Sequence, residues 1–217
     1  MIHYDFEQGT QEWLDARKGC ITGSKFGVAR DRLKNGNPSA KATLYAKDVA
    51  RERCGGTPEK QFNTYAMKIG REQEAMARAA YELRRGVLAE PVGFFATEDR
   101  MFGLSPDSLV DSDGVLEIKV MVSSDNLFTS VVEGDVSEFI DQCDGYLWLL
   151  GRQWVDLVLW APDLADLGLD LVVRRITRNE ERIEKLEADL RAFSLTVRTY
   201  ESALRKAAAA NKQKETA

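Results

Sequence analysis

The sequence predicts an α/β fold in which a central mixed sheet is flanked by helices and followed by a long C-terminal helix. Apolar, β-prone runs alternate with amphipathic helical segments through the middle of the chain. A stripe of apolar residues at spacings of three and four then marks the last helix. With 217 residues, of which 44% are hydrophobic, the chain can bury one sizeable core. We therefore expect a single domain with three parts, at residues 1–60, 61–176 and 177–217.

Helices dominate the first part of the chain. Thr22 or Ser24 is placed to cap a helix that begins near Lys25, because a hydroxyl can accept the free N–H groups of a first turn. A later, longer helix carries a predicted buried stripe that consists of Ala66, Ile69, Ala77, Ala80 and Leu83. We expect the helices at residues 8–17, from about 25, at 40–54 and at 62–85.

Strands and helices alternate in the rest of the core. Three short β-prone runs separated by turn residues predict an antiparallel meander. Two helical segments and two further apolar runs follow it. We expect strands at residues 92–97, 101–104, 115–120, 154–160 and 169–176, with helices at 123–132 and 139–150.

The last part of the chain predicts one long helix. Thr177 and Glu180 have the spacing of a capping box. We expect the apolar stripe of this helix to pack on the same chain, and packing on another subunit is the alternative. The polar tail after residue 207 is expected to fray. The stripe consists of Ile183, Leu186, Leu190, Phe193, Val197, Tyr200 and Leu204.

The composition excludes several classes of protein. No apolar run reaches the length of a membrane span, and the first residues do not form a signal peptide, so we expect a cytoplasmic protein. Cys20, Cys54 and Cys143 are scattered without a CxxC pair, which argues against a zinc or iron–sulfur site. The single histidine, His3, disfavours histidine-based catalysis.

Charge is distributed unevenly along the chain. The net charge is −5, yet residues 17–60 contain eleven Lys and Arg against four Asp and Glu. Residues 98–170 are acidic in balance. This pattern fits a phosphate-holding surface beside a metal site. An uneven surface charge without a partner is the alternative.

One constellation of residues carries chemistry. Glu117 and Lys119 lie two apart in a β-prone run, so their side chains point to the same face of a strand. The turn-forming residues 111–114 allow a hairpin to fold Asp107 back beside Glu117. Two carboxylates can hold a hard divalent cation, while the lysine orients or deprotonates an attacking water. Solvated charges on a surface hairpin are the alternative, but buried charges need partners or a metal.

The pattern Pro106-Asp107, then Glu117-Ile118-Lys119, resembles the PD-(D/E)xK nuclease motif. With its surroundings, the chain resembles the YqaJ and phage λ exonuclease family of viral recombination nucleases, which implies a restriction-endonuclease-like core. The resemblance rests on four blocks in family order, at residues 13–24, 70–78, 103–107 with 116–119, and 142–148.

The resemblance implies roles for the acidic cluster. Asp107 and Glu117 would be metal ligands, and the backbone carbonyl of Ile118 would complete that site. Glu74, in the helix before the sheet, would ligate or position a second metal. Lys119 would contact the attacking water and the scissile phosphate. An ordinary solvated helix charge is the alternative for Glu74.

The resemblance also implies roles around the cluster. Gln142 would bind near the lysine or the attacking water, and Tyr146, one turn further along the helix, is expected as support or core. Arg17 and Ser24 match positions that hold a 5′ phosphate, and Ser105 would join them. A guanidinium and hydroxyls suit phosphate oxygens.

The implied activity is a processive 5′-to-3′ exonuclease that acts on double-stranded DNA ends and leaves 3′ overhangs. It would use two Mg²⁺ ions per site, for which Mn²⁺ could substitute. Met67 would be a wedge that splays the terminal base pairs, or a core residue. Residues 1–60 would bind the DNA end and residues 61–176 would form the catalytic core. A homotrimeric ring, a single-strand annealing partner, and a phage or prophage origin in a bacterial host are also implied.

Two other functions remain open at this stage. One is a different nuclease of the same fold, such as a RecB-like enzyme or a restriction-type endonuclease. The other is a non-catalytic scaffold that binds DNA ends. The intact Asp107, Glu117 and Lys119 argue against the scaffold.

Overall fold

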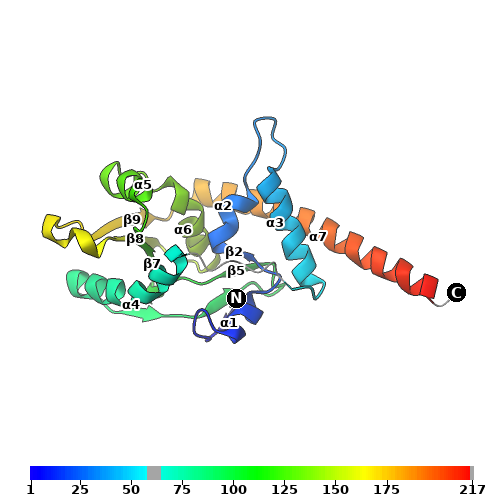
Figure 1. Ribbon diagram of the computed structural model, residues 1–217, viewed down its shortest axis with the longest axis horizontal. Coiled ribbons are helices and arrows are strands. Elements are labelled where there is room, and N and C mark those ends of the chain that lie inside the picture. Colours follow the sequence, from blue (N-terminus) through cyan, green and yellow to red (C-terminus); the bar gives the residue numbers. More distant parts are fainter. Residues whose placement is uncertain (58–64, 216–217) are drawn as a thin grey trace.

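The computed structural model describes the backbone of residues 1–57 and 65–215, and the side chains of residues 65–68, 71 and 215 lie outside that description. The chain forms two sheets with helices packed around them (Figure 1). The predicted α/β class and the long C-terminal helix are confirmed. The predicted central mixed sheet is confirmed, but the predicted strands at residues 92–97 and 101–104 belong to a second, smaller sheet.

The larger sheet has the strand order β3-β6-β7-β8-β9. β7 and β8 are parallel, and the other neighbouring pairs are antiparallel. A parallel pair needs a long crossover, which here contains two short helical segments and α6. The strands are β3 (Ala89–Pro91), β6 (Ser108–Val110), β7 (Gly114–Val120), β8 (Trp154–Trp160) and β9 (Leu171–Thr177). The crossover contains α5 (Ser124–Leu127), η2 (Phe128–Val132) and α6 (Ser137–Leu149), and η3 (Pro162–Leu167) joins β8 to β9.

The smaller sheet has the order β1-β4-β5-β2, with β2 parallel to β5. Gly103 in β5 lets the Phe94 ring pack against the backbone, since a Cβ there would lie 2.1 Å from that ring. After β5 the chain passes through Ser105-Pro106-Asp107 into β6 of the other sheet, so this short segment joins the two sheets. The strands are β1 (Ile2–Tyr4), β2 (Ile21–Thr22), β4 (Phe94–Ala96) and β5 (Phe102–Leu104).

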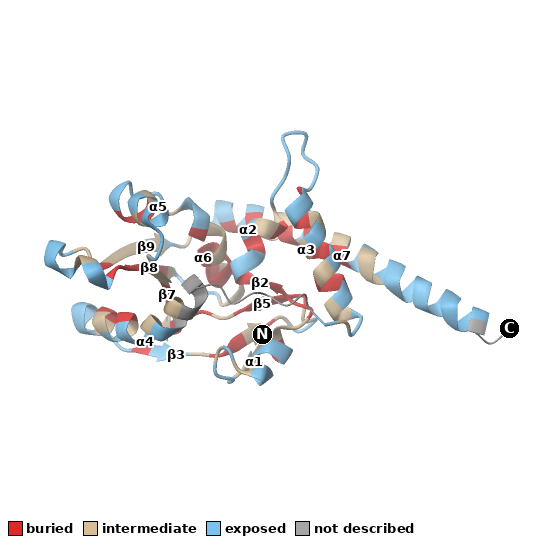
Figure 2. Ribbon diagram, in the orientation of Figure 1, coloured by how far each residue is buried: buried red, intermediate tan, exposed pale blue. Residues whose placement is uncertain are grey.

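Alternate residues of the central strands face different helices. Val115 and Leu157 belong to a core that includes α6, α3 (Ala40–Arg53) and α7 (Glu180–Glu215). Leu116 and Val158 belong to a second core that includes Ala77 of α4 (Tyr65–Arg85). Buried residues therefore line both faces of the larger sheet (Figure 2), as a strand pair covered on both sides requires.

Two details of α4 differ from the prediction. Leu83 is 89% exposed, and Tyr81 is the buried residue of that turn. Tyr81 follows Ala77 by four residues, so the buried face continues at helical spacing through a residue that a purely apolar stripe overlooks. The predicted helix start at residue 62 and the side chain of Ala66 lie outside the described residues.

The N-terminal helices form as predicted, but not with the predicted caps. They are α1 (Gln11–Arg17), the 3₁₀ turn η1 (Gly23–Lys25), α2 (Phe26–Ala29) and α3. Within the described residues, neither Thr22 nor Ser24 makes a side-chain capping bond. Thr10 and Ser39 cap α1 and α3 instead, by accepting from the backbone N–H groups of Trp13 and Ala42.

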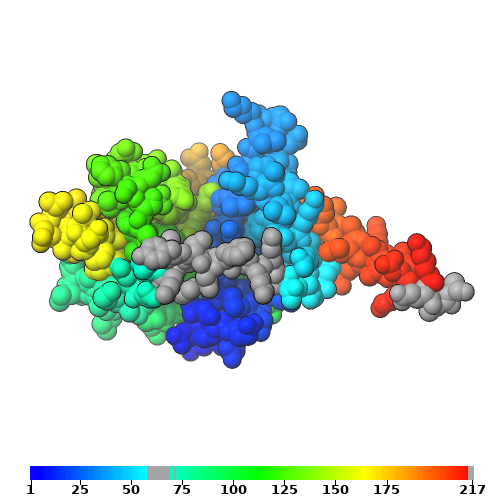
Figure 3. All heavy atoms as spheres, viewed as in Figure 1, coloured from blue at the N-terminus to red at the C-terminus, as the bar shows by residue number. Residues whose placement is uncertain are grey.

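The C-terminal helix α7 is longer than predicted. Its first half packs on the body, whereas its second half projects from it (Figure 3). Asn179 caps the helix by accepting from the N–H of Arg182 at 2.9 Å, so the capping box predicted at Thr177 is wrong. The predicted fraying after residue 207 is also wrong, since an alanine- and lysine-rich stretch favours helix. Five of the predicted stripe residues are buried, namely Ile183, Leu186, Leu190, Phe193 and Val197.

Across the described ranges, the helices are all too short or too polar to cross a membrane.

Candidate active site

The centre of the site lies on β7. Glu117 and Lys119 project from the same face of this strand, and their Oε1 and Nζ atoms are 2.8 Å apart. Glu117 is only 3% exposed. The charged pair is therefore inside the protein and not on a surface hairpin.

Helix α6 supplies the partners of this pair. Gln142 Nε2 donates to Glu117 Oε1 at 2.7 Å, and Lys119 Nζ donates to Gln142 Oε1 at 3.1 Å. The Tyr146 hydroxyl donates to Glu117 Oε2 at 2.6 Å and accepts from Gln142 Nε2. The Phe139 ring lies 5.4 Å from Lys119 Nζ. Gln142 and Tyr146 are four residues apart, so one face of α6 holds both oxygens of Glu117.

Asp107 reaches the pair from the segment between the two sheets. The β6–β7 hairpin turns through residues 111–113, with Asp111 in the left-handed region at φ 47°, and brings Asp107 beside β7. Asp107 Oδ2 accepts from the backbone N–H of Ile118 at 2.6 Å. Burial raises the pKa of Asp107 well above its usual range, and the charges of Glu117 and Glu74 raise it further.

Glu74 comes from α4, on the other side of the sheet. Its carboxylate lies 3.6 Å from Arg78, one turn along the helix. Burial raises the pKa of Glu74, Arg78 opposes this shift, and the charge of Glu117 adds to it. Glu74 therefore lies close enough to Glu117 on β7 for the two charges to interact. Among the residues that the structure describes, no three His, Cys, Asp or Glu side chains are gathered into a metal-binding group.

The protonation states follow from this arrangement. Burial alone would lower the pKa of Lys119, but the charge and hydrogen bond of Glu117, with the charge of Asp107, raise it above its ordinary value. Lys119 is therefore a cation at neutral pH and acts by its charge and its N–H donors. Burial and the charges of Glu117 and Asp107 also raise the pKa of Tyr146. The single ammonium of Lys119 faces the carboxylates of Glu117 and Asp107. A hard divalent cation would relieve the repulsion between these two carboxylates.

A second group of side chains lies beside the first. Arg17 and Trp13, both on α1, each donate to Ser105 Oγ, at 3.3 and 3.0 Å. The Arg17 guanidinium lies 4.0 Å above the Trp13 ring. Burial lowers the pKa of Arg17, and within the described ranges no carboxylate forms an ion pair with it. A half-buried guanidinium without such a partner is suited to an anion.

The structure thus brings Asp107, Glu117, Lys119 and Gln142 together, and separately Arg17 and Ser105. Ser105 is two residues before Asp107, and its carbonyl accepts from Tyr146 at 3.4 Å, so the two groups adjoin.

Three predicted residues have less direct support. Ser24 is exposed on η1, which packs on α6 and β5. Ile118 contributes its N–H to Asp107, and the role implied for its carbonyl stays a prediction. Met67 lies in α4, but its side chain is outside the described residues.

Sequence reasoning missed the polar role of two aromatic residues. Tyr146 was expected only as support or core, whereas its hydroxyl holds Glu117 directly. Trp13 gave no polar signal at all, yet its indole N–H holds Ser105. Their spacing of four residues from Gln142 and from Arg17 is the signal that could have indicated these contacts.

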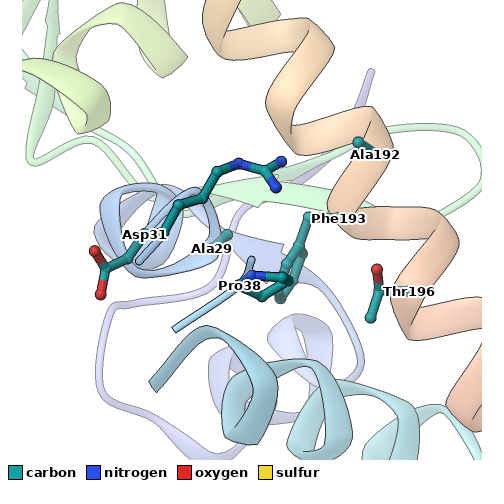
Figure 4. Close-up of a pocket in the computed structure, with 7 residues that line it drawn as sticks. Ala29, Asp31, Pro38, Ala192, Phe193 and Thr196 are labelled. Atoms are coloured by element: carbon teal, nitrogen blue, oxygen red, sulfur yellow. The ribbon is translucent and has the colours of Figure 1, made fainter. Parts of the chain in front are cut away.

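A small pocket of about 120 Å³ lies away from these residues, between the loop after α2 and the middle of α7 (Figure 4). None of the predicted site residues lines it. Its lining consists of Ala29, Asp31, Arg32, Pro38, Ala192, Phe193 and Thr196.

Comparison with known proteins identifies the family. The model of the YqaJ-like viral recombinase domain matches residues 12–153. The chain therefore belongs to this family, and the resemblance seen in the sequence is confirmed. No curated protein matches the sequence significantly.

Solved structures agree with this assignment. An alkaline exonuclease from Laribacter hongkongensis, LHK-Exo, is 30% identical with a TM-score of 0.81, and the match covers 92% of this chain and 98% of that one. A second structure of LHK-Exo, in complex with dAMP, is 29% identical with a TM-score of 0.82 and the same coverage. A phage-related exonuclease from Haemophilus somnus 129PT, 17% identical with a TM-score of 0.65, covers 86% of this chain and 95% of that one and shows the shared fold.

Proposed function

We propose that this protein is a Mg²⁺-dependent exonuclease that processively degrades the 5′-ended strand of double-stranded DNA. It would leave 3′ overhangs for recombination by single-strand annealing. The observation that carries the proposal is the buried Glu117, paired with Lys119 and beside Asp107, next to the half-buried Arg17. The family of viral recombinases and the exonuclease activity of LHK-Exo support a nuclease role.

The donor chemistry fits a divalent cation. Asp107 and Glu117 would hold it, with the Ile118 carbonyl completing the site and Glu74 ligating or positioning a second ion. Divalent cations supply neutralisation of the developing phosphate charge and a lower pKa for water. Two Mg²⁺ ions are proposed, with Mn²⁺ as a substitute. The Glu117 oxygens are held by Lys119, Gln142 and Tyr146, so the orientation of the carboxylate is fixed by the fold.

The protein side chains have distinct roles in this proposal. Lys119, as a cation, would donate to the scissile phosphate and to the attacking water. Gln142 accepts from Lys119 Nζ and so fixes the direction of the ammonium. Tyr146, with its raised pKa, stays a hydrogen-bond donor and holds the second oxygen of Glu117.

The preference for a 5′ end would come from the neighbouring group. Arg17 and Ser105 would bind the terminal phosphate, and Ser24 would add a hydroxyl. Only one residue separates Ser105 from Asp107. A phosphate bound at Ser105 would therefore lie a short distance from the carboxylate of Asp107. Met67 is proposed as the wedge at the end of the duplex.

The assembly is proposed from the family. A homotrimeric ring would let basic residues of the first 60 positions face DNA while the outside stays acidic. A single-strand annealing protein would load on the overhang, within the cytoplasm of a bacterial host that carries the phage or prophage. Residues 61–176 would form the catalytic core of the one domain.

The direct test is the variant Lys119→Ala, assayed on linear duplex DNA with and without Mg²⁺. The variant should lose digestion by at least about a hundredfold while it still folds and binds DNA ends. Full activity in the variant would contradict the proposed role of Lys119 in the active site. Digestion of closed circular DNA by the parent protein would favour an endonuclease, and end binding without any digestion would favour a scaffold.

A further inference from the structure

Helix α4 is fastened to the larger sheet by two polar contacts on one face. Trp160 Nε1, at the end of β8, donates to Gln73 Oε1 at 2.9 Å. The Tyr81 hydroxyl donates to Asp156 Oδ2, in the middle of β8, at 2.8 Å. Gln73 and Tyr81 are eight residues apart, with the buried Ala77 between them, so all three lie on the face toward the sheet.

The contact at Asp156 is the stronger anchor. Asp156 is fully buried and receives two hydrogen bonds from its cross-strand partner Arg175, at 2.7 and 2.8 Å. Arg85 lies 3.5 Å away. Burial alone would raise the pKa of Asp156, but the bonds from Arg175 and Tyr81 lower it below the ordinary value. This anchor lies about two helical turns from Glu74 and is satisfied without it.

The contact at Gln73 is different because Gln73 precedes Glu74 directly. Successive side chains of a helix are separated by about 100° and 1.5 Å, so a fixed Gln73 fixes the direction of Glu74. Trp160 is 7% exposed and pairs in register with Val120, one residue after Lys119 in β7. The Trp160–Gln73 bond therefore connects the turn of α4 that contains Glu74 to the strand pair that carries the site.

We propose that the hydrogen bond from Trp160 to Gln73 is a positioning contact that sets how Glu74 faces Asp107 and Glu117. This inference rests on the proposed function, in which these carboxylates hold divalent cations. Without the bond, this part of α4 can rotate or lift, which would move Glu74 away from Asp107 and Glu117. The Tyr81–Asp156 contact holds the same helix but has no such effect on metal binding.

The test uses variants that remove one polar atom and keep the bulk of the side chain. Gln73→Met removes the acceptor, Trp160→Phe removes the donor, and Tyr81→Phe is the matched control on the same helix. Titration of the metal-free protein with Mn²⁺, followed by calorimetry without DNA, should show about tenfold weaker binding for the first two variants. Tyr81→Phe should lower the Tm but bind Mn²⁺ as the parent does.

A pair of double variants separates positioning from general destabilisation. Gln73→Met combined with Trp160→Phe should be no weaker than either alone, because both remove the same bond. Gln73→Met in a Glu74→Gln background should change Mn²⁺ binding no further.

Four results would overturn the inference, and they differ in what they say about the proposed function. Unchanged Mn²⁺ binding in Gln73→Met, while Glu74→Gln weakens it, removes only the positioning role. If Mn²⁺ binding weakens in all three single variants in proportion to their loss of Tm, the Trp160–Gln73 bond only stabilises the fold. A Glu74→Gln protein that binds as the parent removes the role of Glu74 together with the inference, and a parent that binds no Mn²⁺ removes the proposed function itself.

Discussion

Two buried carboxylates in neighbouring strands have opposite surroundings. Asp156 in β8 and Glu117 in β7 are 0% and 3% exposed. Asp156 faces α4 and has two cations, Arg175 and Arg85, so its charge is more than balanced. Glu117 faces α6 and has one cation, Lys119, while further carboxylates adjoin it.

The pKa shifts show the same difference. The pKa of Asp156 is lowered, because hydrogen bonds from Arg175 and Tyr81 outweigh its burial. The pKa of Asp107 is raised well above its usual range by burial and by Glu117 and Glu74. A buried charge that the fold itself neutralises is a structural contact. A surplus of buried negative charge costs stability, and proteins retain such a surplus where a function needs it.

The variant Asp107→Asn is the strongest test of this difference between the two carboxylate environments. The asparagine can still accept from the Ile118 N–H, but the surplus charge falls by one. We expect DNA digestion to drop by at least about a hundredfold, because a proposed metal ligand is lost. The metal-free variant should at the same time unfold at a higher Tm than the parent. A variant that digests DNA at the parental rate would contradict the assignment.

The opposite result is expected for Asp156→Asn. Removing this charge weakens the hydrogen bonds from Arg175, whose side chain is 45% exposed, and should lower the free energy of unfolding by about 2 kcal/mol. Urea denaturation followed by circular dichroism measures this change. The digestion rate of the folded protein should stay close to that of the parent. A variant as stable as the parent would show that the cluster is not the anchor described above.

Arg17 is the converse case, a half-buried cation that has no carboxylate partner among the described residues. Arg17→Ala should abolish the difference in rate between duplexes with and without a 5′ phosphate, a loss of about tenfold on the phosphorylated end. Arg205→Ala, at an exposed arginine that pairs with Glu201 on α7, is the control and should keep that difference. Equal rates on both ends in the parent protein would count against the 5′-phosphate pocket.

The smallest expected effect is on the pH dependence of stability. The pKa of Asp107 is raised from 3.8, so its ionised form destabilises the fold. Relative to Asp107→Asn, the metal-free parent should lose stability as the pH rises from 3.8 through the raised pKa. The pKa of Asp156 is lowered from 3.8, so its contribution is present above that pH and is lost as the pH falls through the lowered value. Thermal melts in EDTA over a pH series would contradict this account if both carboxylates gave slopes of the same sign.

Much of the larger sheet was predictable because its signals are local. β8 spans the seven residues 154–160 that the apolar run predicts, since a strand buried on both faces is continuously apolar. The shared face of Glu117 and Lys119 follows from the period of two in a strand. The division into two sheets was not predictable in this way, because strand partners are set by contacts between distant segments, such as that between β2 and β5.

The sequence indicates site residues that are charged and stand in a regular pattern. It does not indicate contacts that depend on a single polar atom. Glu117 and Lys119 are charged residues in an apolar run, which is unusual enough to notice. Asn179 at the start of α7 and the indole of Trp13 act through one hydrogen bond each. The Trp13 contact depends on where the fold places Ser105, which lies 92 residues further along the chain. The Asn179 cap is local, but Thr177 offers a competing capping signal in the same stretch of sequence.

The central claim is that the surplus of carboxylates around Glu117 forms a metal-dependent site for cleaving DNA from its 5′ ends. Digestion of a linear duplex labelled at either the 5′ or the 3′ end, with Mg²⁺ or EDTA, tests it most directly. We predict early release of the 5′ label and a persistent 3′-labelled strand, with Mg²⁺ only. Early release of the 3′ label, or equal digestion in EDTA, would contradict it.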